Sequence, residues 1–262
     1  AADAATLFGA LETHMASFAT VYHFARAIMA TGDEATATTI TAMAAVDDQR
    51  VACTYGRADT ATGKAFAGWG SPSYEIVNNF AARAAASLPS TDMARVASGS
   101  VTGVTAISHD EYVTEVMDIA RITTMRTWPG RSGYYFTNGR LKSAAGSDFQ
   151  WWQYGRVMDI ACRTTYVTQQ EFIAKGVRTN ADGTIDERDA QRFETKVQAA
   201  LEAVLLQPKN AEGTRGHVSA LSYRIDRTNN LATTGVLQSE VAIRPLGYPK
   251  TITTQIGFDL TV

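Results

Sequence analysis

The stretch that most constrains the fold is residues 128–163, where aromatic and arginine side chains are concentrated. It opens with Trp128-Pro129-Gly130, a turn signal, and continues into an aromatic segment, Gly133 to Thr137, that predicts a short strand. Asn138-Gly139 predicts another turn, and a polar loop then leads into a long helix over residues 148–174. Tryptophan, tyrosine and arginine are typical of packing centres and of protein interfaces. The chain therefore either packs around this stretch or assembles through it.

Ahead of this stretch, the sequence predicts a parallel pair of strands. Residues 18–28 and 50–55 are rich in β-forming side chains, and residues 34–47 between them predict a helix. Strand, helix and strand within about forty residues indicate a βαβ unit, whose two strands run parallel. A helix over residues 4–16 precedes this unit.

Further short elements flank the central stretch. The predicted helices cover residues 74–87, 108–120 and 184–206, and the predicted strands cover residues 104–107 and 122–128. Ser108 with Glu111, and Thr184 with Glu187, match capping boxes at the start of two of these helices. We therefore expect an α+β or α/β fold, with a mixed β-sheet flanked by helices.

After Gly216 the pattern changes to strict alternation and predicts a β-rich C-terminal region. Residues 221–225 and 237–244 alternate apolar with polar side chains, and residues 245–250 form a loop to a final strand. One face of that strand carries Ile252, Ile256, Phe258, Leu260 and Val262. An amphipathic strand at a chain end leaves an unpaired edge. It is either part of a sheet within the subunit or an arm that adds to a neighbour's sheet.

A charged face of the long helix is a second candidate contact surface. Arg156, Asp159 and Arg163 are three and four residues apart, so they share one helix face. They form either a solvated pair within the helix, worth about 0.2–0.5 kcal/mol, or a charge patch between subunits. The sequence leaves both interpretations open.

Composition argues against two classes of partner. The 262 residues carry a formal net charge of -2, so no basic excess favours direct binding to nucleic acid. No apolar run reaches the roughly 18 residues that a membrane span requires, and we expect no membrane insertion. The two cysteines, Cys53 in a predicted strand and Cys162 in a predicted helix, favour a reduced, cytoplasmic setting.

Motifs for catalysis, metals or cofactors are incomplete. Residues 58–64 nearly match a phosphate-binding loop, but Ala65 stands where a Ser or Thr would hold magnesium. Residues 178–189 have part of a calcium-loop pattern, with an arginine in place of the first ligand. We predict no catalytic, cofactor-binding or metal-binding residues. The alternative is a small-molecule enzyme of unknown type, with a site in the loops over residues 56–73 and 98–103.

An ordered set of segments resembles the sheath proteins of contractile phage tails and related injection machines. These segments are Trp128-Pro129-Gly130, Tyr134 to Gly139 (YYFTNG), Gly146 to Phe149 (GSDF), Arg156 to Arg163 (RVMDIACR), Gly183-Thr184-Ile185 and, at the end, Arg244 to Ile252 (RPLGYPKTI) with Ile256-Gly257-Phe258. The likeness covers most of the chain and is strongest over residues 108–258. No single segment is diagnostic, and the order of the set carries the resemblance.

The resemblance implies a structural function without catalysis or a cofactor. Such proteins stack as rings or a helical lattice around a tail tube, in an extended, metastable state. They then contract irreversibly and drive the tube through a cell envelope, while terminal arms exchange strands between neighbours. Carried to this chain, the arm is residues 251–262, and the candidate contacts between subunits are Arg156, Asp159, Arg163, Ile252, Ile256, Phe258 and Leu260.

The resemblance also implies partners and a location. The partners are further copies of the chain, a tail tube protein, and baseplate and tail terminator proteins. The expected location is the virion, as a phage tail sheath assembled in the cytoplasm of the bacterial host. Another self-assembling tail protein is the alternative within the structural class.

The resemblance treats residues 1–262 as one sheath-like domain. Residues 1–107 form its strand–helix–strand front part, and residues 108–262 form a C-terminal core that ends in a β-hairpin or arm over residues 236–262. Sheath proteins of this kind are usually longer, with an additional N-terminal portion and arm. We therefore expect this chain to be a fragment without that portion, or a minimal variant.

Overall fold

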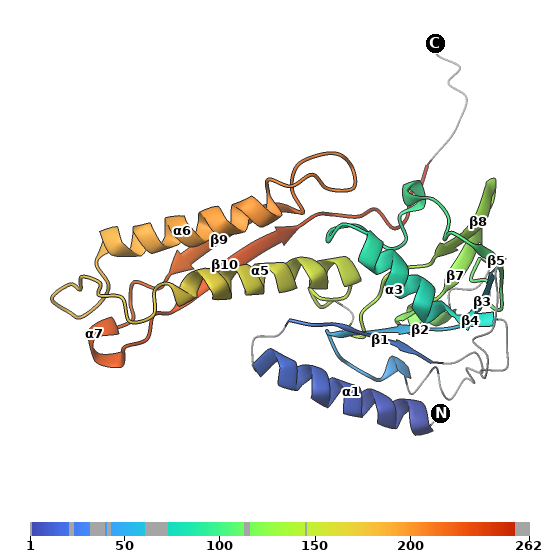
Figure 1. The fold of residues 1–262 in the computed structure, drawn as a ribbon, viewed down its shortest axis with the longest axis horizontal. Coiled ribbons are helices and arrows are strands. Elements are labelled where there is room, and N and C mark those ends of the chain that lie inside the picture. Colours follow the sequence, from blue (N-terminus) through green and yellow to red (C-terminus); the bar gives the residue numbers. More distant parts are fainter. Residues whose placement is uncertain are drawn as a thin grey trace, which may run out of the picture.

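Two groups of elements lie end to end along the long axis of the molecule (Figure 1). The computed structural model describes residues 2–20, 24–31, 40, 43–60, 73–112, 116–144 and 146–254. Short strands and helices of residues 2–144 form the front lobe, and residues 152–245 form a long layer of two helices and a β-hairpin, the hairpin layer. The predicted α+β class is confirmed, with the described strands divided among four small sheets.

A three-stranded parallel sheet lies at the centre of the front lobe. β1 (Ala27–Ala30) and β6 (Ile122–Thr123) both run parallel to the middle strand, β2 (Val51–Thr54). All four residues of β2 are buried, as expected for a strand covered on both faces. The parallel pair predicted from the βαβ pattern is confirmed by β1 and β2, and the helix predicted over residues 34–47 lies largely outside the described residues.

The strand predicted over residues 18–28 is wrong for most of its length. Helix α1 (Ala2–Thr20) runs into that segment, and β1 begins only at Ala27. The reason is a helical stripe, since Phe8, Leu11, Met15 and Phe18 recur every three or four residues and pack in one cluster with β1 and β2. This longer helical period outweighed the local alternation of β-forming side chains.

Antiparallel strands form the far end of the front lobe. β3 (Arg57–Thr60) pairs with β4 (Ser73–Glu75) and β5 (Val104–Ile107), so the loop predicted over residues 56–73 contains strands at both ends. β7 (Met125–Trp128) and β8 (Arg131–Phe136) form a hairpin. The single strand predicted over residues 122–128 is therefore divided between two sheets, because β6 pairs with β2 and β7 with β8.

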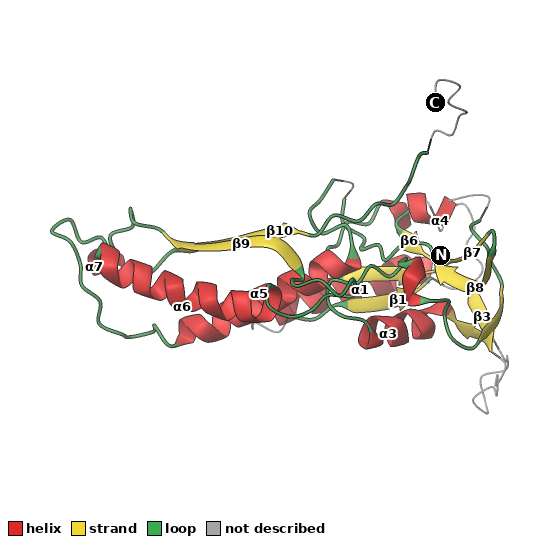
Figure 2. Cartoon of the chain, turned by 90° about the horizontal axis from the view of Figure 1, so that it is seen from above, coloured by secondary structure: helices red, strands yellow, loops and turns green. Residues whose placement is uncertain are grey.

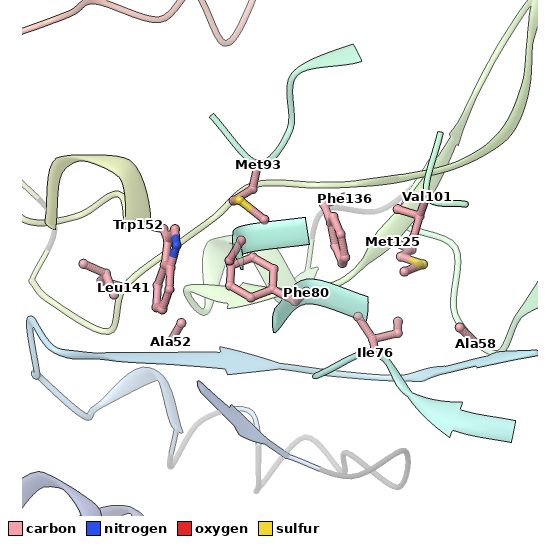
Figure 3. Close-up of a cluster of buried hydrophobic side chains, with 11 residues drawn as sticks. Ala52, Ala58, Ile76, Phe80, Met93, Val101, Met125, Phe136, Leu141 and Trp152 are labelled. Carbon is pink, nitrogen blue, oxygen red and sulfur yellow. The ribbon is translucent and has the colours of Figure 1, made fainter. Parts of the chain in front are cut away.

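Aromatic side chains from three elements form the core of the front lobe (Figure 3). Phe80 of α3 (Ile76–Ala86) lies edge-on to Phe136 of β8 and to Trp152 of α5 (Trp152–Gln170), with ring centroids 5.4 Å apart in both pairs. Met93 packs in the same cluster, ahead of a short 3-10 helix, η1 (Val96–Ser98). Part of the aromatic stretch is therefore a packing centre.

Two predicted capping boxes are wrong. α4 (Val116–Ile119) is a single turn whose first backbone N–H groups are bound by the buried Glu111 carboxylate, and the Ser108 hydroxyl instead accepts a hydrogen bond from the backbone N–H of Arg57. α6 (Glu187–Leu205) begins after Asp186, whose side chain accepts from the backbone N–H of Arg188 at 3.0 Å. Asp186 is therefore the N-cap, in place of the predicted Thr184.

The hairpin layer has two sublayers (Figure 2). The helices α5 (Trp152–Gln170) and α6 lie under an antiparallel hairpin of β9 (Val218–Ile225) and β10 (Ser239–Pro245), and a single turn, α7 (Leu231–Thr234), joins the strands. The helix predicted over residues 184–206 is confirmed by α6, whose buried face carries the apolar residues Ala190, Phe193, Val197, Leu201 and Leu205. Residues 251–254 have no regular secondary structure, and residues 255–262 of the predicted final strand lie outside the described residues.

A buried ion pair joins the front lobe to the hairpin layer. The Arg26 guanidinium binds both carboxylate oxygens of Asp159 on α5, with Nε–Oδ2 and Nη2–Oδ1 distances of 2.6 and 3.0 Å. It also donates to the carbonyl groups of Gly155 and Gln49, at 2.8 and 2.5 Å. Burial raises the pKa of Asp159, and the adjacent guanidinium opposes that rise.

Gly155 lets Arg26 approach α5, which gives a first prediction. A Cβ atom at position 155 would lie 2.2 Å from the Arg26 Cζ atom, so Gly155→Ala forces the guanidinium out of its site. We expect this variant to lose about 1–3 kcal/mol in free energy of unfolding, measured by urea denaturation, although alanine favours helices. The matched control is Gly9→Ala in α1, where a Cβ meets nothing within 4 Å, and we expect a gain of about 0.5–1 kcal/mol. A gain in both variants would contradict the role given to Arg26.

Lys142 is fully buried beside the parallel sheet. Its ammonium group donates to the backbone carbonyl of Ala120 at 2.8 Å. Burial lowers its pKa from the ordinary 10.5 to about 8, because the charged form has lost its water. Between pH 8 and 10.5 the unfolded chain therefore holds a proton that the folded chain lacks, so Lys142 makes folding more favourable as the pH rises.

This titration gives a second prediction. We expect the free energy of unfolding to rise by about 1 kcal/mol more between pH 7 and 9 in the wild type than in Lys142→Met. The measurement is urea denaturation at both pH values, and comparison with the variant cancels the other titrating groups. The range stops at pH 9 because burial raises the pKa of Cys53 to about 12, which favours unfolding at higher pH. Identical pH dependence in both proteins would refute the assignment.

Candidate subunit interface

The structure gives the three charged residues of the predicted helix face different surroundings. Asp159 binds Arg26 of the same chain, and Arg156 donates to the backbone carbonyls of Ser87 and Leu88 at 3.1 and 3.4 Å. Arg163, one turn further along α5, is exposed. Two of the three therefore make contacts within the subunit, and Arg163 is the one with an exposed side chain.

Aromatic side chains fix the path of the chain after β10. The Tyr248 hydroxyl binds the backbone carbonyl of Ser90, and the Tyr154 hydroxyl donates to the carbonyl of Leu246 at 2.9 Å. The two tyrosine rings lie 5.9 Å apart. Burial raises the pKa of Tyr248, so its phenol, which is protonated at neutral pH, also keeps donating in more alkaline solution. The segment after the hairpin is thereby held on the front lobe.

Lys250 completes this attachment. Its ammonium group forms an ion pair with the buried Asp92, donates to Asn138 Oδ1 at 2.8 Å and lies 4.3 Å from the centroid of the Trp151 ring. Asp92 is also bound by the side-chain amide of Gln153 at 2.9 Å. We call Tyr248 and Lys250 with these partners the arm root, because they fix where the chain leaves the molecule.

Residues 251–254, directly after the arm root, lead away from the body of the molecule (Figure 1). Residues 251–254 are all exposed, and Ile252 retains 81% of its accessible surface. A β-branched apolar residue in this setting lacks the packing that such a side chain makes in a folded unit. Ile256, Phe258 and Leu260 lie outside the described residues. The structure thus places one of the predicted contact residues, Ile252, on an uncovered segment.

The arm root was not predicted from the sequence. Tyr248 and Lys250 belong to the segment that resembles sheath proteins, but no pattern assigned a role to their partners Ser90, Asp92 and Asn138. The one local signal is the tyrosine and lysine on either side of Pro249, directly before an alternating segment. Such a pair can anchor the start of an arm, but its partners are too distant in sequence to be recognised.

The loops proposed for an enzyme site have structural roles where they are described. The backbone N–H of Val101 donates to the carbonyl of Tyr134 at 2.8 Å, and Arg83 donates to the carbonyl of Gly99 at 3.1 Å. Three surface cavities of about 680, 410 and 520 Å³ are lined by residues from other parts of the chain. Residues 61–72 of the first loop lie outside the described residues.

The described part of the chain holds neither a candidate metal site nor a membrane-spanning helix. Within it, no group of three or more His, Cys, Asp or Glu side chains is placed to hold a metal ion. None of the described helices is both long enough and apolar enough to cross a membrane.

Comparison with solved structures shows a fold shared with contractile injection systems. No protein-family model matches the chain, and no curated protein matches it either. A chain of the six-fold symmetrised baseplate of the anti-feeding prophage (AFP), solved by cryo-EM, is similar with a TM-score of 0.62 and 14% identity, over 98% of this chain and 65% of that one.

Two sheath structures give the same result. A chain of the AFP helical sheath in the contracted state has a TM-score of 0.60 and 14% identity, over 94% of this chain and 64% of that one. A chain of the contracted sheath of an extracellular contractile injection system, PVC, has a TM-score of 0.58 and 12% identity, over 89% of this chain and 64% of that one. The present chain therefore has a sheath-like fold and spans 64 or 65% of the length of these matches.

The arm root gives a third prediction. We expect Lys250→Met to increase amide hydrogen exchange over residues 246–254 while leaving exchange in β2 and α6 unchanged, because the ion pair to Asp92 holds only this segment. Hydrogen–deuterium exchange with mass spectrometry makes the measurement. The control is Lys209→Met, which changes an exposed lysine outside the arm root. Unchanged exchange over residues 246–254 would show that Lys250 does not hold the segment.

Proposed function

We propose that this chain is a subunit of a contractile sheath, in a phage tail or a related injection apparatus. The observation that carries the proposal is the sheath-like fold over 89–98% of the chain, shared with chains of AFP and PVC assemblies. The subunits polymerise around a tail tube and store conformational energy. A repacking between discrete arrangements of the lattice then drives the tube through a cell envelope.

The terminal segment is the proposed link between subunits. The arm root fixes the start of residues 251–262, and the exposed Ile252 begins an alternating apolar face. A strand of this kind adds to the edge of a neighbour's sheet, where backbone hydrogen bonds give affinity and alternate side chains set the register. The contact residues Ile252, Ile256, Phe258 and Leu260 face the apolar side of that sheet.

The remaining assignments belong to the same proposal. Residues 1–262 act as one sheath-like domain. The helix face of Arg156, Asp159 and Arg163 lies nearest a neighbour or the tube, and the exposed Arg163 makes the contact while the other two hold the face in place. The partners are further copies of the chain, a tail tube protein, and baseplate and tail terminator proteins. The location is the virion, after assembly in the cytoplasm of a bacterial host. The subunit acts without catalysis or a cofactor, and its contacts are to protein.

Negative-stain electron microscopy tests the proposal and gives a fourth prediction. We expect the full-length chain to form rings or tubes, and a version ending at Lys250 to lose them, because the linking strand is gone. Tubes in both versions would support the sheath function and would refute the role of residues 251–262 as the link between subunits. If both versions stay monomeric at high concentration, the shared fold would be the sole remaining support for the proposal. A ligand-dependent rise in melting temperature would then favour the enzyme alternative.

Point variants sharpen the same experiment. Ile256→Asp places a charge on the apolar face of the arm, whereas Gln255→Asp places it on the opposite, polar face. We expect assembly to fail in the first variant and to persist in the second, because only the first buries a charge against the neighbour's sheet. Equal assembly by both variants would show that the arm does not bind as an alternating strand.

A further inference from the structure

Side chains of α6 cover the outer edge of β9. The Gln198 side-chain carbonyl accepts from the backbone N–H of Tyr223 at 3.0 Å, and its amide nitrogen donates to the carbonyl of Leu221 at 3.4 Å. One side-chain amide therefore satisfies a donor and an acceptor that a neighbouring strand would otherwise bind. Gln198 thus occupies the place of a peptide group from a third strand.

A second pair of side chains closes the same edge further along. The backbone N–H of Ile225 donates to Glu194 Oε1 at 2.7 Å, and the Arg227 guanidinium donates to the carbonyl of Ile225 at 2.7 Å. Arg227 is itself held by ion pairs to Glu187 and Glu194. We call Glu194, Gln198 and Arg227 the edge cap, because together they bind four backbone groups on the outer edge of β9.

The register of the hairpin shows which groups of β10 face outward. The backbone N–H of Asp226 donates to the carbonyl of Gln238 at 2.9 Å, and the paired residues then alternate between bonded and non-bonded pairs. Val241 and Ile243 are opposite Tyr223 and Leu221, so their backbone groups point away from β9. Among the described residues, no group binds these outward N–H and C=O groups.

Two side chains of α5 form hydrogen bonds at the two ends of that open edge of β10. Gln169 donates to the Ser239 hydroxyl at 2.9 Å, where the strand begins, and Tyr154 donates to the carbonyl of Leu246, just past its end. Among the described residues, none hydrogen-bonds to the outward backbone groups between these two ends. The side chains of Val241 and Ile243 pack against the core of the hairpin layer, so a strand added here would extend an existing apolar face.

We propose that strand addition to this hairpin is one-sided, an inference that rests on the proposed sheath function. The edge of β10, at Val241 and Ile243, accepts residues 251–262 of a second copy of the chain. The edge cap excludes strand addition at β9, because an incoming strand would have to displace side chains that already satisfy the backbone. Gln198 and Glu194 therefore determine which edge of the sheet a neighbour can use.

Photocrosslinking of the full-length chain tests this inference. The probe is p-benzoylphenylalanine in place of Phe258, in an equal mixture of ¹⁴N- and ¹⁵N-labelled protein so that mass spectrometry recognises bonds between copies. We expect intermolecular adducts on β10 and none on β9. In Glu194→Ala with Gln198→Ala, adducts on β9 should appear beside those on β10. Arg192→Ala with Thr195→Ala changes exposed residues of the same helix and should retain the wild-type pattern.

The outcomes distinguish failure of the one-sided edge from failure of the proposed sheath function. Adducts on β9 in the wild type, or none on β9 in the double variant, overturn the one-sided edge while the sheath function stands. Tubes that form with adducts on neither strand also overturn the one-sided edge alone. Absence of both tubes and intermolecular adducts removes the sheath function and the inference together. If the double variant has a lower melting temperature than the Arg192→Ala, Thr195→Ala control, Gln198→Ala alone provides the same comparison.

Discussion

A largely buried ion pair, Arg26 with Asp159, holds the front lobe against the hairpin layer. Two charges removed from water are tolerated only where hydrogen bonds satisfy them, and Arg26 meets this condition with the carboxylate and two backbone carbonyls. Its approach requires Gly155, because any side chain there would occupy the place of the guanidinium. Loss of one partner would leave a buried charge unpaired, at a cost of about 3–5 kcal/mol.

The start of α5 extends this constraint to the arm. Trp152 packs on Phe80 of α3, Gln153 binds Asp92 of the arm root, and Tyr154 binds the chain just past β10. The next two positions, Gly155 and Arg156, contact the segments before β1 and after α3. Five consecutive residues therefore touch five different parts of the chain. The arm root therefore contacts the same helix that joins the two halves of the molecule, and on the proposed function a pull on the arm would act directly on that helix.

The sequence predicted those features that depend on the spacing of residues close together in the chain. Helix α6 and the alternation of β9 each follow from burial of one face at a regular period, so the sequence predicted both elements. The strand predicted over residues 18–28 was wrong because a helical period and a strand period compete there. The helical stripe that ends at Phe18 prevails. The arm root could not be predicted, since Lys250 and Asp92 are 158 positions apart and no spacing rule connects them. The edge cap was missed for the same reason, because it depends on which helix lies beside β9.

On the proposed function, a one-sided hairpin has a consequence for assembly. A donated arm and an acceptor edge are different surfaces, so in a ring or helical lattice their contact is heterologous and repeats from copy to copy. Each subunit then gives one strand and receives one, which yields an unbranched series of linked subunits. If β9 also accepted a strand, two neighbours could compete for one hairpin and the series could branch. Gln198 and Glu194 occupy that edge. Each hairpin would then receive a strand from one neighbour only, and the series would stay unbranched while the subunits of the lattice repack.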